Sequence, residues 1–132
     1  MPLVTFNVPL TLSNDRVTGL REAVHEALVA TAEVPSDDRF HVIHRPDASG
    51  LSIDPGFLGV ARGPDAVIVE ITFRMGRTQH QKQALYSEIA RLALARAGFR
   101  SEDVMVVLTE NTSLDWSFGG GVAQYALAPV PV

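Results

Sequence analysis

The sequence contains no cysteine, which excludes disulfides, thiolate metal sites and cysteine nucleophiles. Lysine and arginine number 11 against 15 acidic residues, and no basic cluster appears, so neither nucleic acid nor an anionic membrane is an expected partner. No stretch approaches the roughly 18 consecutive apolar residues of a membrane span. The N-terminus lacks a basic region followed by a long apolar core, so we expect a cytoplasmic protein without a signal peptide.

The residues that are present are those of an ordinary globular protein. Apolar residues make up 46% and charged residues 20% of the 132-residue chain, which is long enough for one hydrophobic core and rarely for two. We therefore expect a single domain over residues 1–132. Phosphate-binding loops, nucleophile elbows, zinc motifs and histidines at metal-ligand spacing are missing, so neither a cofactor nor a metal is predicted.

The beginning of the chain predicts a strand, a helix and a second strand. The apolar run Leu3–Val8 is typical of a strand. Apolar residues recur at steps of three and four through Arg16–Thr31, which indicates a helix with one apolar face, capped by Ser13 or Asn14. Phe40–His44 predicts the second strand.

The same order returns later in the chain. Ala66–Phe73 is so continuously apolar that we expect a strand buried on both faces. Thr78 and Gln81 fit a capping box at the start of a second helix, and Gly98 is a natural stop for it. Val104–Leu108 predicts a fourth strand.

These two halves superimpose at an offset of 65 residues. Ser13 falls on Thr78, and "SDDRFHVI" from Ser36 falls on "SEDVMVVL" from Ser101. The pattern indicates a duplicated β-α-β unit, and crossover helices make the strands within each unit parallel.

The duplication predicts an α/β (α+β) fold with a four-stranded mixed sheet and two helices on one face. The repeats cover about 2–45 and 66–110, a Gly/Pro-rich loop with at most one helical turn joins them, and the segment 111–132 follows. A short extended piece is expected near Val122–Leu127. Because the helices cover only one face of the sheet, its other apolar face predicts an oligomer.

Pro2 raises the first chemical question. Methionine before a small residue is usually removed, which would leave the secondary amine of proline at the terminus. An α-amino group has a pKa near ~7.7–8, and an apolar pocket or a nearby arginine lowers that pKa towards neutrality, where proton transfer is effective. The amine could alternatively attack a carbonyl and form an iminium. Proline at position two can also be idle.

Two arginines follow the third predicted strand. Arg74 and Arg77 lie in "TFRMGRTQ", between that strand and the next helix. Ligands of α/β sheets bind at the carboxyl ends of strands, arginine binds carboxylates through paired hydrogen bonds, and a helix N-terminus adds donors. The alternative is a pair of solvated surface arginines.

Three further residues have two interpretations each. Asp38 lies in "VPSDDRF" and corresponds to Asp103 in the other half, so it is either a recurring structural aspartate or a partner of the amine. Trp116 and Phe118 in "DWSFGGG" either pack in the core or form an apolar wall that excludes water from a pocket.

With Pro2, the doubled β-α-β unit and "GRTQHQKQALYSEIA" considered together, the chain resembles the tautomerase superfamily. Within it the chain is most similar to malonate semialdehyde decarboxylase, over nearly its whole length. The stretches that carry this resemblance are "VPSDDRF", "HRP", "GLSIDPGFLGVARG" and "LTENTSLDWSFGGGVAQY".

The resemblance implies roles for individual residues. Pro2 matches the catalytic proline, Asp38 the aspartate that assists it, and Arg77 an arginine that holds the substrate carboxylate. In the decarboxylase one residue separates two arginines, whereas two residues separate Arg74 from Arg77 here, so the role of Arg74 stays open. The residues that match the apolar wall are Trp116, Phe118 and Tyr125.

The resemblance also implies an enzyme, usually a homotrimer at this length, that acts on a small oxo or enol carboxylic acid. Decarboxylation of a malonate semialdehyde-type substrate and keto–enol tautomerisation are both compatible with this set of residues. Dehalogenation with hydration is a third chemistry on the same scaffold. A non-catalytic trimer that binds or signals is the alternative from another class.

Overall fold

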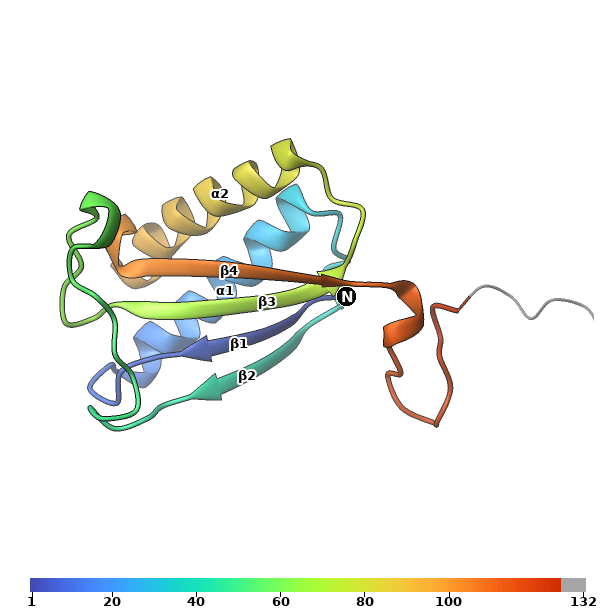
Figure 1. Ribbon diagram of the computed structural model, residues 1–132, viewed down its shortest axis with the longest axis horizontal. Helices are drawn as coiled ribbons and strands as arrows, with labels where there is room; N and C mark the ends of the chain where they lie inside the picture. Colours follow the sequence, from blue (N-terminus) through green and yellow to red (C-terminus); the bar gives the residue numbers. More distant parts are fainter. Residues whose placement is uncertain (127–132) are drawn as a thin grey trace, which may run out of the picture.

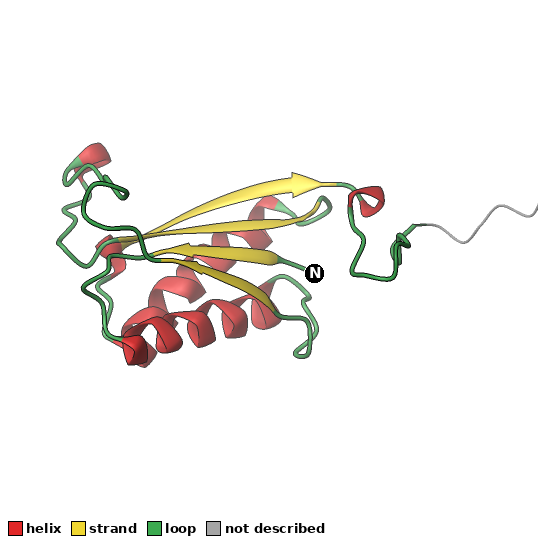
Figure 2. Cartoon of the chain, turned by 90° about the horizontal axis from the view of Figure 1, so that it is seen from below, coloured by secondary structure: helices red, strands yellow, loops and turns green. Residues whose placement is uncertain are grey.

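A computed structural model describes residues 1–126 of the chain (Figure 1). Two long helices lie side by side against one face of a four-stranded sheet, so the protein has two layers (Figures 1 and 2). The main elements in chain order are β1 (Leu3–Asn7), α1 (Asn14–Thr31), β2 (Phe40–His44), β3 (Val67–Arg74), α2 (Gln79–Ala97) and β4 (Val104–Asn111). Among residues 1–126, no helix combines the length and apolar character needed to cross a membrane.

The strand order β2-β1-β3-β4 confirms the duplicated, mixed sheet. β1 pairs with β2 in parallel and β3 pairs with β4 in parallel, while β1 and β3 meet antiparallel at the centre. Leu3 pairs with Phe40 and Val67 pairs with Val104, a spacing of 37 residues in both halves. The two units therefore repeat in register as well as in sequence.

Local signals set the ends of both helices. The Ser13 side chain accepts a hydrogen bond from the Arg16 amide, so α1 begins at Asn14, two residues before the predicted start. Thr78 and Gln81 form the expected capping box of α2. Gly98 ends α2 with φ 67°, a left-handed conformation that suits glycine.

The hydrophobic core lies between the helices and the inner face of the two central strands. Val4 and Phe6 of β1 and Ile71 and Phe73 of β3 are fully buried there. The prediction that β3 is buried on both faces is wrong for the single chain. Its residues alternate instead, and Glu70 is exposed, because no second layer covers the other face.

The uncovered face of the sheet carries exposed apolar side chains from three strands. We call this surface the open face, and its exposed apolar residues are Leu3, Phe40, Val42, Met105 and Val107. They alternate along the strands with residues that face the helices. The expected uncovered face is therefore present.

Several predicted strand bounds differ from the observed ones. β1 ends at Asn7 instead of Val8, and β3 runs one residue later than predicted, over Val67–Arg74. β4 continues to Asn111, three residues beyond the expected Leu108, because Arg74 at the end of β3 still pairs with Asn111. The extended piece near Val122–Leu127 is wrong where it can be checked, since residues 122–126 form turns. Leu127 lies outside the described residues.

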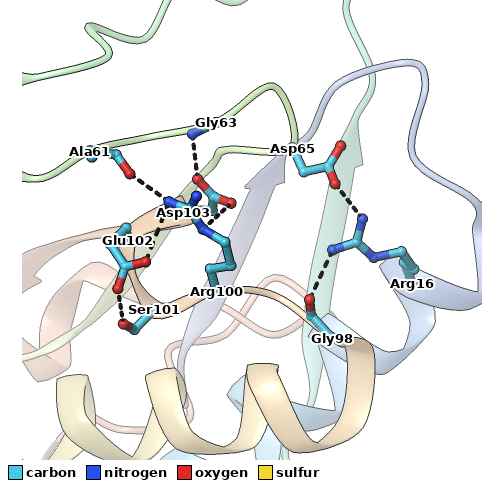
Figure 3. A network of polar contacts seen from close by, with 9 residues as sticks. All are labelled: Arg16, Ala61, Gly63, Asp65, Gly98, Arg100, Ser101, Glu102 and Asp103. Carbon is cyan, nitrogen blue, oxygen red and sulfur yellow. Dashed lines mark hydrogen bonds and ion pairs between the residues drawn. The ribbon is translucent and has the colours of Figure 1, made fainter.

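The linker between the halves contains one short 3₁₀ turn at Phe57–Gly59. Polar contacts tie it to the first turn of α1 and to the segment between α2 and β4 (Figure 3). The buried Asp103 carboxylate accepts the Gly63 amide at 2.7 Å. Arg16 pairs with Asp65 at 2.7 Å and donates to the Gly98 carbonyl at 3.4 Å. These contacts hold the linker against the beginnings of β3 and β4.

Candidate active site

The amino terminus lies at the end of the sheet where β3 and β4 finish (Figures 1 and 2). β1 is a central strand, so the chain begins between two neighbours. If both strand registers are continued to the first residue, Met1 is level with Asp38 on one side and with Arg74 on the other. The sheet thereby brings together groups that are far apart in the sequence.

The terminal amino group contacts the carboxylate of Asp38. The chain described here retains Met1, whose ammonium pairs with Asp38 Oδ2. Met1 is 3% exposed and the Asp38 side chain 12%, so this ion pair is largely shielded from water. Pro2 is buried behind it, and its nitrogen is part of a peptide bond in this form of the chain.

Arg77 is held by backbone carbonyls. Its Nε and Nη2 donate to the Ala32 carbonyl at 3.1 and 3.0 Å, and its Nη1 donates to the Arg74 carbonyl at 3.0 Å. Burial is the main cause that lowers the pKa of the Arg77 guanidinium, and the nearby positive charge of Arg74 adds to it. The guanidinium also lies 4.8 Å from the centre of the Phe73 ring. Arg77 thus fastens the end of α1 to the turn after β3.

Arg74 has different surroundings. Its guanidinium lies over the Tyr125 ring, 4.7 Å from the ring centre. Within residues 1–126, no hydrogen bond or ion pair involves its side chain. Arg74 and Arg77 both line a polar hollow of about 270 Å³, together with Glu33, Gln81 and Ser113. The arginine whose role the sequence leaves open is therefore the one whose side-chain donors have no partner among residues 1–126.

The segment after β4 adds a group of aromatic rings at this edge. Trp116 and Phe118 stack with their rings 5.5 Å apart, and Tyr125 meets Phe118 edge-on at 5.1 Å. The Trp116 indole donates to the Asn111 side chain at 2.6 Å, which anchors the group to the end of β4. Trp116, Phe118 and Tyr125 therefore form one aromatic group, and Tyr125 also contacts Arg74.

Sequence reasoning missed Phe40 as a member of this group. Phe40 lies 5.7 Å from Phe118, ring centre to ring centre, and belongs to the open face. The signal was its position at the first residue of β2, directly after Asp38 and Arg39. Among residues 1–126, no three histidine, aspartate or glutamate side chains gather closely enough to hold a metal ion.

Comparisons with known proteins agree on one family. The family model described as "Tautomerase enzyme" matches residues 38–119. A curated relative from Bacillus subtilis (strain 168), the probable tautomerase YusQ, is 36% identical over 124 residues, which cover 94% of this chain and 98% of the relative.

Solved structures of malonate semialdehyde decarboxylases share the fold over nearly the whole chain. The FG41 enzyme, inhibited by 3-bromopropiolate, superimposes with a TM-score of 0.86 at 35% identity over 93% of each chain. A second such decarboxylase, described with decarboxylase and hydratase activities, gives 0.87 at 28% identity, covering 93% of this chain and 95% of the other. A fused 4-OT, described as a symmetric trimer, shares the fold at 22% identity with a TM-score of 0.73, covering 91% and 94%.

The fold and the site geometry define a protein of the tautomerase class, with the terminal amino group at the sheet edge. The chain belongs to the tautomerase family and is close to malonate semialdehyde decarboxylase.

Proposed function

We propose that this protein is an enzyme that uses the amine of Pro2, after removal of Met1, on a small oxo or enol carboxylic acid. The observation that carries the proposal is the shielded contact between the chain's amino group and Asp38, beside two arginines and an aromatic wall. An extended residue spans at most ~3.6 Å, so the Pro2 nitrogen would become an amine within about one residue's length of that contact. The space now filled by the buried Met1 would then be open to a substrate.

Arg74 is the residue that we propose to bind the substrate carboxylate. Its side-chain donors have no partner among residues 1–126, whereas Arg77 already donates to two carbonyls. Arginine presents paired donors that match a carboxylate. Arg77, which the resemblance alone suggests for this task, would hold the turn and add positive charge to the hollow. The rings of Trp116, Phe118 and Tyr125 would exclude water from the reacting group.

The contact with Asp38 favours malonate semialdehyde-type decarboxylation over tautomerisation. A carboxylate beside an amine stabilises the ammonium form. Protonated Pro2 would donate a hydrogen bond to the aldehyde oxygen of a β-oxo acid. The bond to the carboxylate carbon would break and carbon dioxide would leave, while its electron pair forms the carbon–carbon double bond of an enolate. Transfer of the Pro2 proton to the enolate oxygen would give the enol of acetaldehyde and leave Pro2 neutral. A neutral Pro2 would instead take an α-proton and return it elsewhere, which is tautomerisation.

The open face supports a homotrimer as the working assembly. Its exposed apolar residues come from β1, β2 and β4 and need cover in water. The fused 4-OT of the same fold is described as a symmetric trimer. We expect light scattering to give three times the 14.3 kDa of one chain, and Val107→Lys on the open face to lower that mass. A monomeric wild type would contradict the trimer.

The function is tested with protein whose N-terminus has been defined by mass spectrometry. Processed wild type should release carbon dioxide from malonate semialdehyde faster than it ketonises phenylenolpyruvate. Pro2→Ala should lower the preferred activity about 10²-fold or more, because the secondary amine is lost. The proposal fails if processed wild type turns over neither compound, or if Pro2→Ala is as active as wild type.

A further inference from the structure

His25 is a buried histidine that the proposed chemistry does not use. It lies on the inner side of α1 and is 7% exposed. Its Nε2 lies 2.9 Å from the carbonyl oxygen of Ser36. A carbonyl can only accept, so Nε2 carries the hydrogen and donates it. The other ring nitrogen, Nδ1, has no hydrogen-bond partner within residues 1–126, so the single polar contact of the ring is with Ser36.

A second contact from the same helix holds the other end of this segment. Arg39 donates to both carboxylate oxygens of Glu22 at 2.6 and 3.0 Å. This hydrogen bond lowers the pKa of Glu22 and raises the pKa of Arg39. Glu22 and His25 are three residues apart, hence on one face of α1. α1 therefore holds residues 36–39 at both ends, through His25 at Ser36 and through Glu22 at Arg39.

Asp38 lies between these two points of attachment. Its amide donates to the Pro35 carbonyl at 3.1 Å, which closes a turn, and its carboxylate pairs with the terminal ammonium. The backbone on either side of Asp38 is thus fixed to α1, and the side chain is aimed at the start of β1.

The ring of His41, on β2, packs against the ring of His25 and limits its movement. The two rings lie 6.3 Å apart and nearly perpendicular, and Phe6 packs against His41 at 5.0 Å. Arg21 Nε donates to His41 Nδ1 at 3.4 Å. Burial is the main cause that lowers the pKa of His41 to about 4, so His41 is uncharged near neutral pH. His25 is therefore packed against an uncharged ring, which is itself held by Phe6.

We propose that His25 is a positioning residue for the reaction, which by holding the Ser36 carbonyl fixes the turn that presents Asp38 to the reactive amine. The inference rests on the proposed function for its consequence in turnover. Its structural part, the control of the Asp38–amine contact, can be measured without any substrate.

Loss of the His25 donor has a defined electrostatic consequence. The charged groups of the site are Asp38, Glu33 and Glu110 with Arg74 and Arg77. Asp38 is the one in contact with the amino group. If its carboxylate moves away, the positive charges of Arg74 and Arg77 become the main electrostatic influence on the amine. The ammonium form is then stabilised less, and the pKa of the Pro2 amine falls. The direction is the same whether the amine works as an acid or as a base.

The test is an NMR titration of ¹⁵N-labelled Pro2 in the processed protein. We expect His25→Leu, which has no donor, to lower the amine pKa by about 0.5 or more. His25→Gln, which carries an N–H at a similar reach, should restore the wild-type value. Val24→Ala is the matched control, because it opens a small cavity at the neighbouring buried position of α1 and leaves the hydrogen bonds of His25 and Glu22 to residues 36–39 in place, so the amine pKa should not change.

Kinetics give the second measurement. If malonate semialdehyde is turned over, His25→Leu should lower kcat about 10- to 100-fold with a smaller change in KM, because a misplaced group costs rate more than binding. An amine pKa in His25→Leu equal to that of wild type overturns the proposal, whatever the activity. Should His25→Leu fail to fold, His25→Phe, which keeps a ring of similar size and has no donor, is titrated instead, and an unchanged amine pKa there overturns the proposal equally. A wild type inactive on every substrate tried contradicts the proposed function and leaves the titration result standing.

Discussion

The two halves of this protein use the same aspartate for different purposes. Asp38 in the first half and Asp103 in the second are 65 residues apart, the offset of the repeat, and each precedes the outer strand of its half. Asp38 pairs with the terminal ammonium, whereas Asp103 accepts the amide of Gly63 in the linker. Asp38 thus faces an amino group, whereas Asp103 faces a peptide amide within the chain.

The two aspartates also have different neighbours in their two halves. Arg74 and Arg77 correspond at this offset to Pro9 and Leu12, so the second end lacks the arginine pair. A hollow of about 330 Å³ is present there as well, lined mainly by apolar side chains of the linker and of the chain after β1. One duplicated scaffold thus carries a polar hollow beside a chain end and an apolar hollow beside a closed linker. The terminal amino group and the two arginines, rather than the fold, therefore distinguish the candidate site.

The largest loss of activity should come from turning the Pro2 nitrogen into a peptide nitrogen, like that of Val67 in the second half. A short N-terminal extension before Pro2 converts its amine to an amide, as at Val67. We expect activity to fall about 10²- to 10⁴-fold, the usual contribution of a general acid or base. Proteolytic removal of the extension, leaving Pro2 first, should restore it. Full activity in the extended protein would show that the two ends do not differ by their amine.

Matched substitutions of the two aspartates should separate their roles. Asp38→Asn removes the charge beside the amine, and we expect a 10- to 100-fold loss of kcat with little change in stability. Asp103→Ala leaves the Gly63 amide unpaired and should cost about 1–3 kcal/mol of unfolding free energy. Activity at saturating substrate and urea unfolding are the measurements. Equal loss of activity in both variants would mean that Asp38 acts only through the fold.

The two arginines should also separate. Arg74→Leu is expected to raise KM about tenfold with unchanged stability, because a free donor pair is lost. Arg77→Leu should lower the unfolding free energy by about 1–3 kcal/mol, since two backbone carbonyls lose their donor. Arg45→Leu is the control at the other end, where Arg45 donates to the Leu12 carbonyl, and it should lower stability without changing KM. A raised KM in Arg77→Leu alone would assign the carboxylate to Arg77.

The smallest effect concerns the pH dependence of stability. His41 in the first half corresponds to Val106 in the second. The pKa of His41 is about 4 in the folded protein, below its ordinary 6.5. Uncharged His41 therefore adds its full share to the free energy of unfolding above pH 6.5, and this share is lost as the pH falls towards 4. After allowance for partial exposure, we expect about 1–2 kcal/mol. Urea unfolding at pH 7.5 and 4.5 measures this loss of stability. The difference between the two pH values should become smaller in His41→Val and stay unchanged in His44→Val, an exposed control on the same strand.

Much of the fold could be predicted because its signals are local. Ser13, Thr78 and Gly98 act within one turn of their helix, and the 65-residue repeat identifies the parallel pairs. The end of β4 at Asn111 could not be predicted, because it depends on pairing with Arg74. The different states of the two arginines could not be predicted either, because Arg77 is held by the carbonyl of Ala32, 45 residues away. The ring of Phe40 joins the aromatic group only through the path taken by the segment after β4.

The burial of Met1 restricts when it could be removed, if it is removed as we propose. In the folded chain Met1 is 3% exposed, and β1 is paired on both sides, so an aminopeptidase cannot reach it. The partner β3 begins at Val67, and at ~5–20 residues per second the ribosome needs about 3–13 seconds to make that much chain. The removal of Met1 that we propose would therefore have to act on the nascent chain, before β1 pairs with β3. Folded protein that still carries Met1 should resist added aminopeptidase and yield to it only after unfolding.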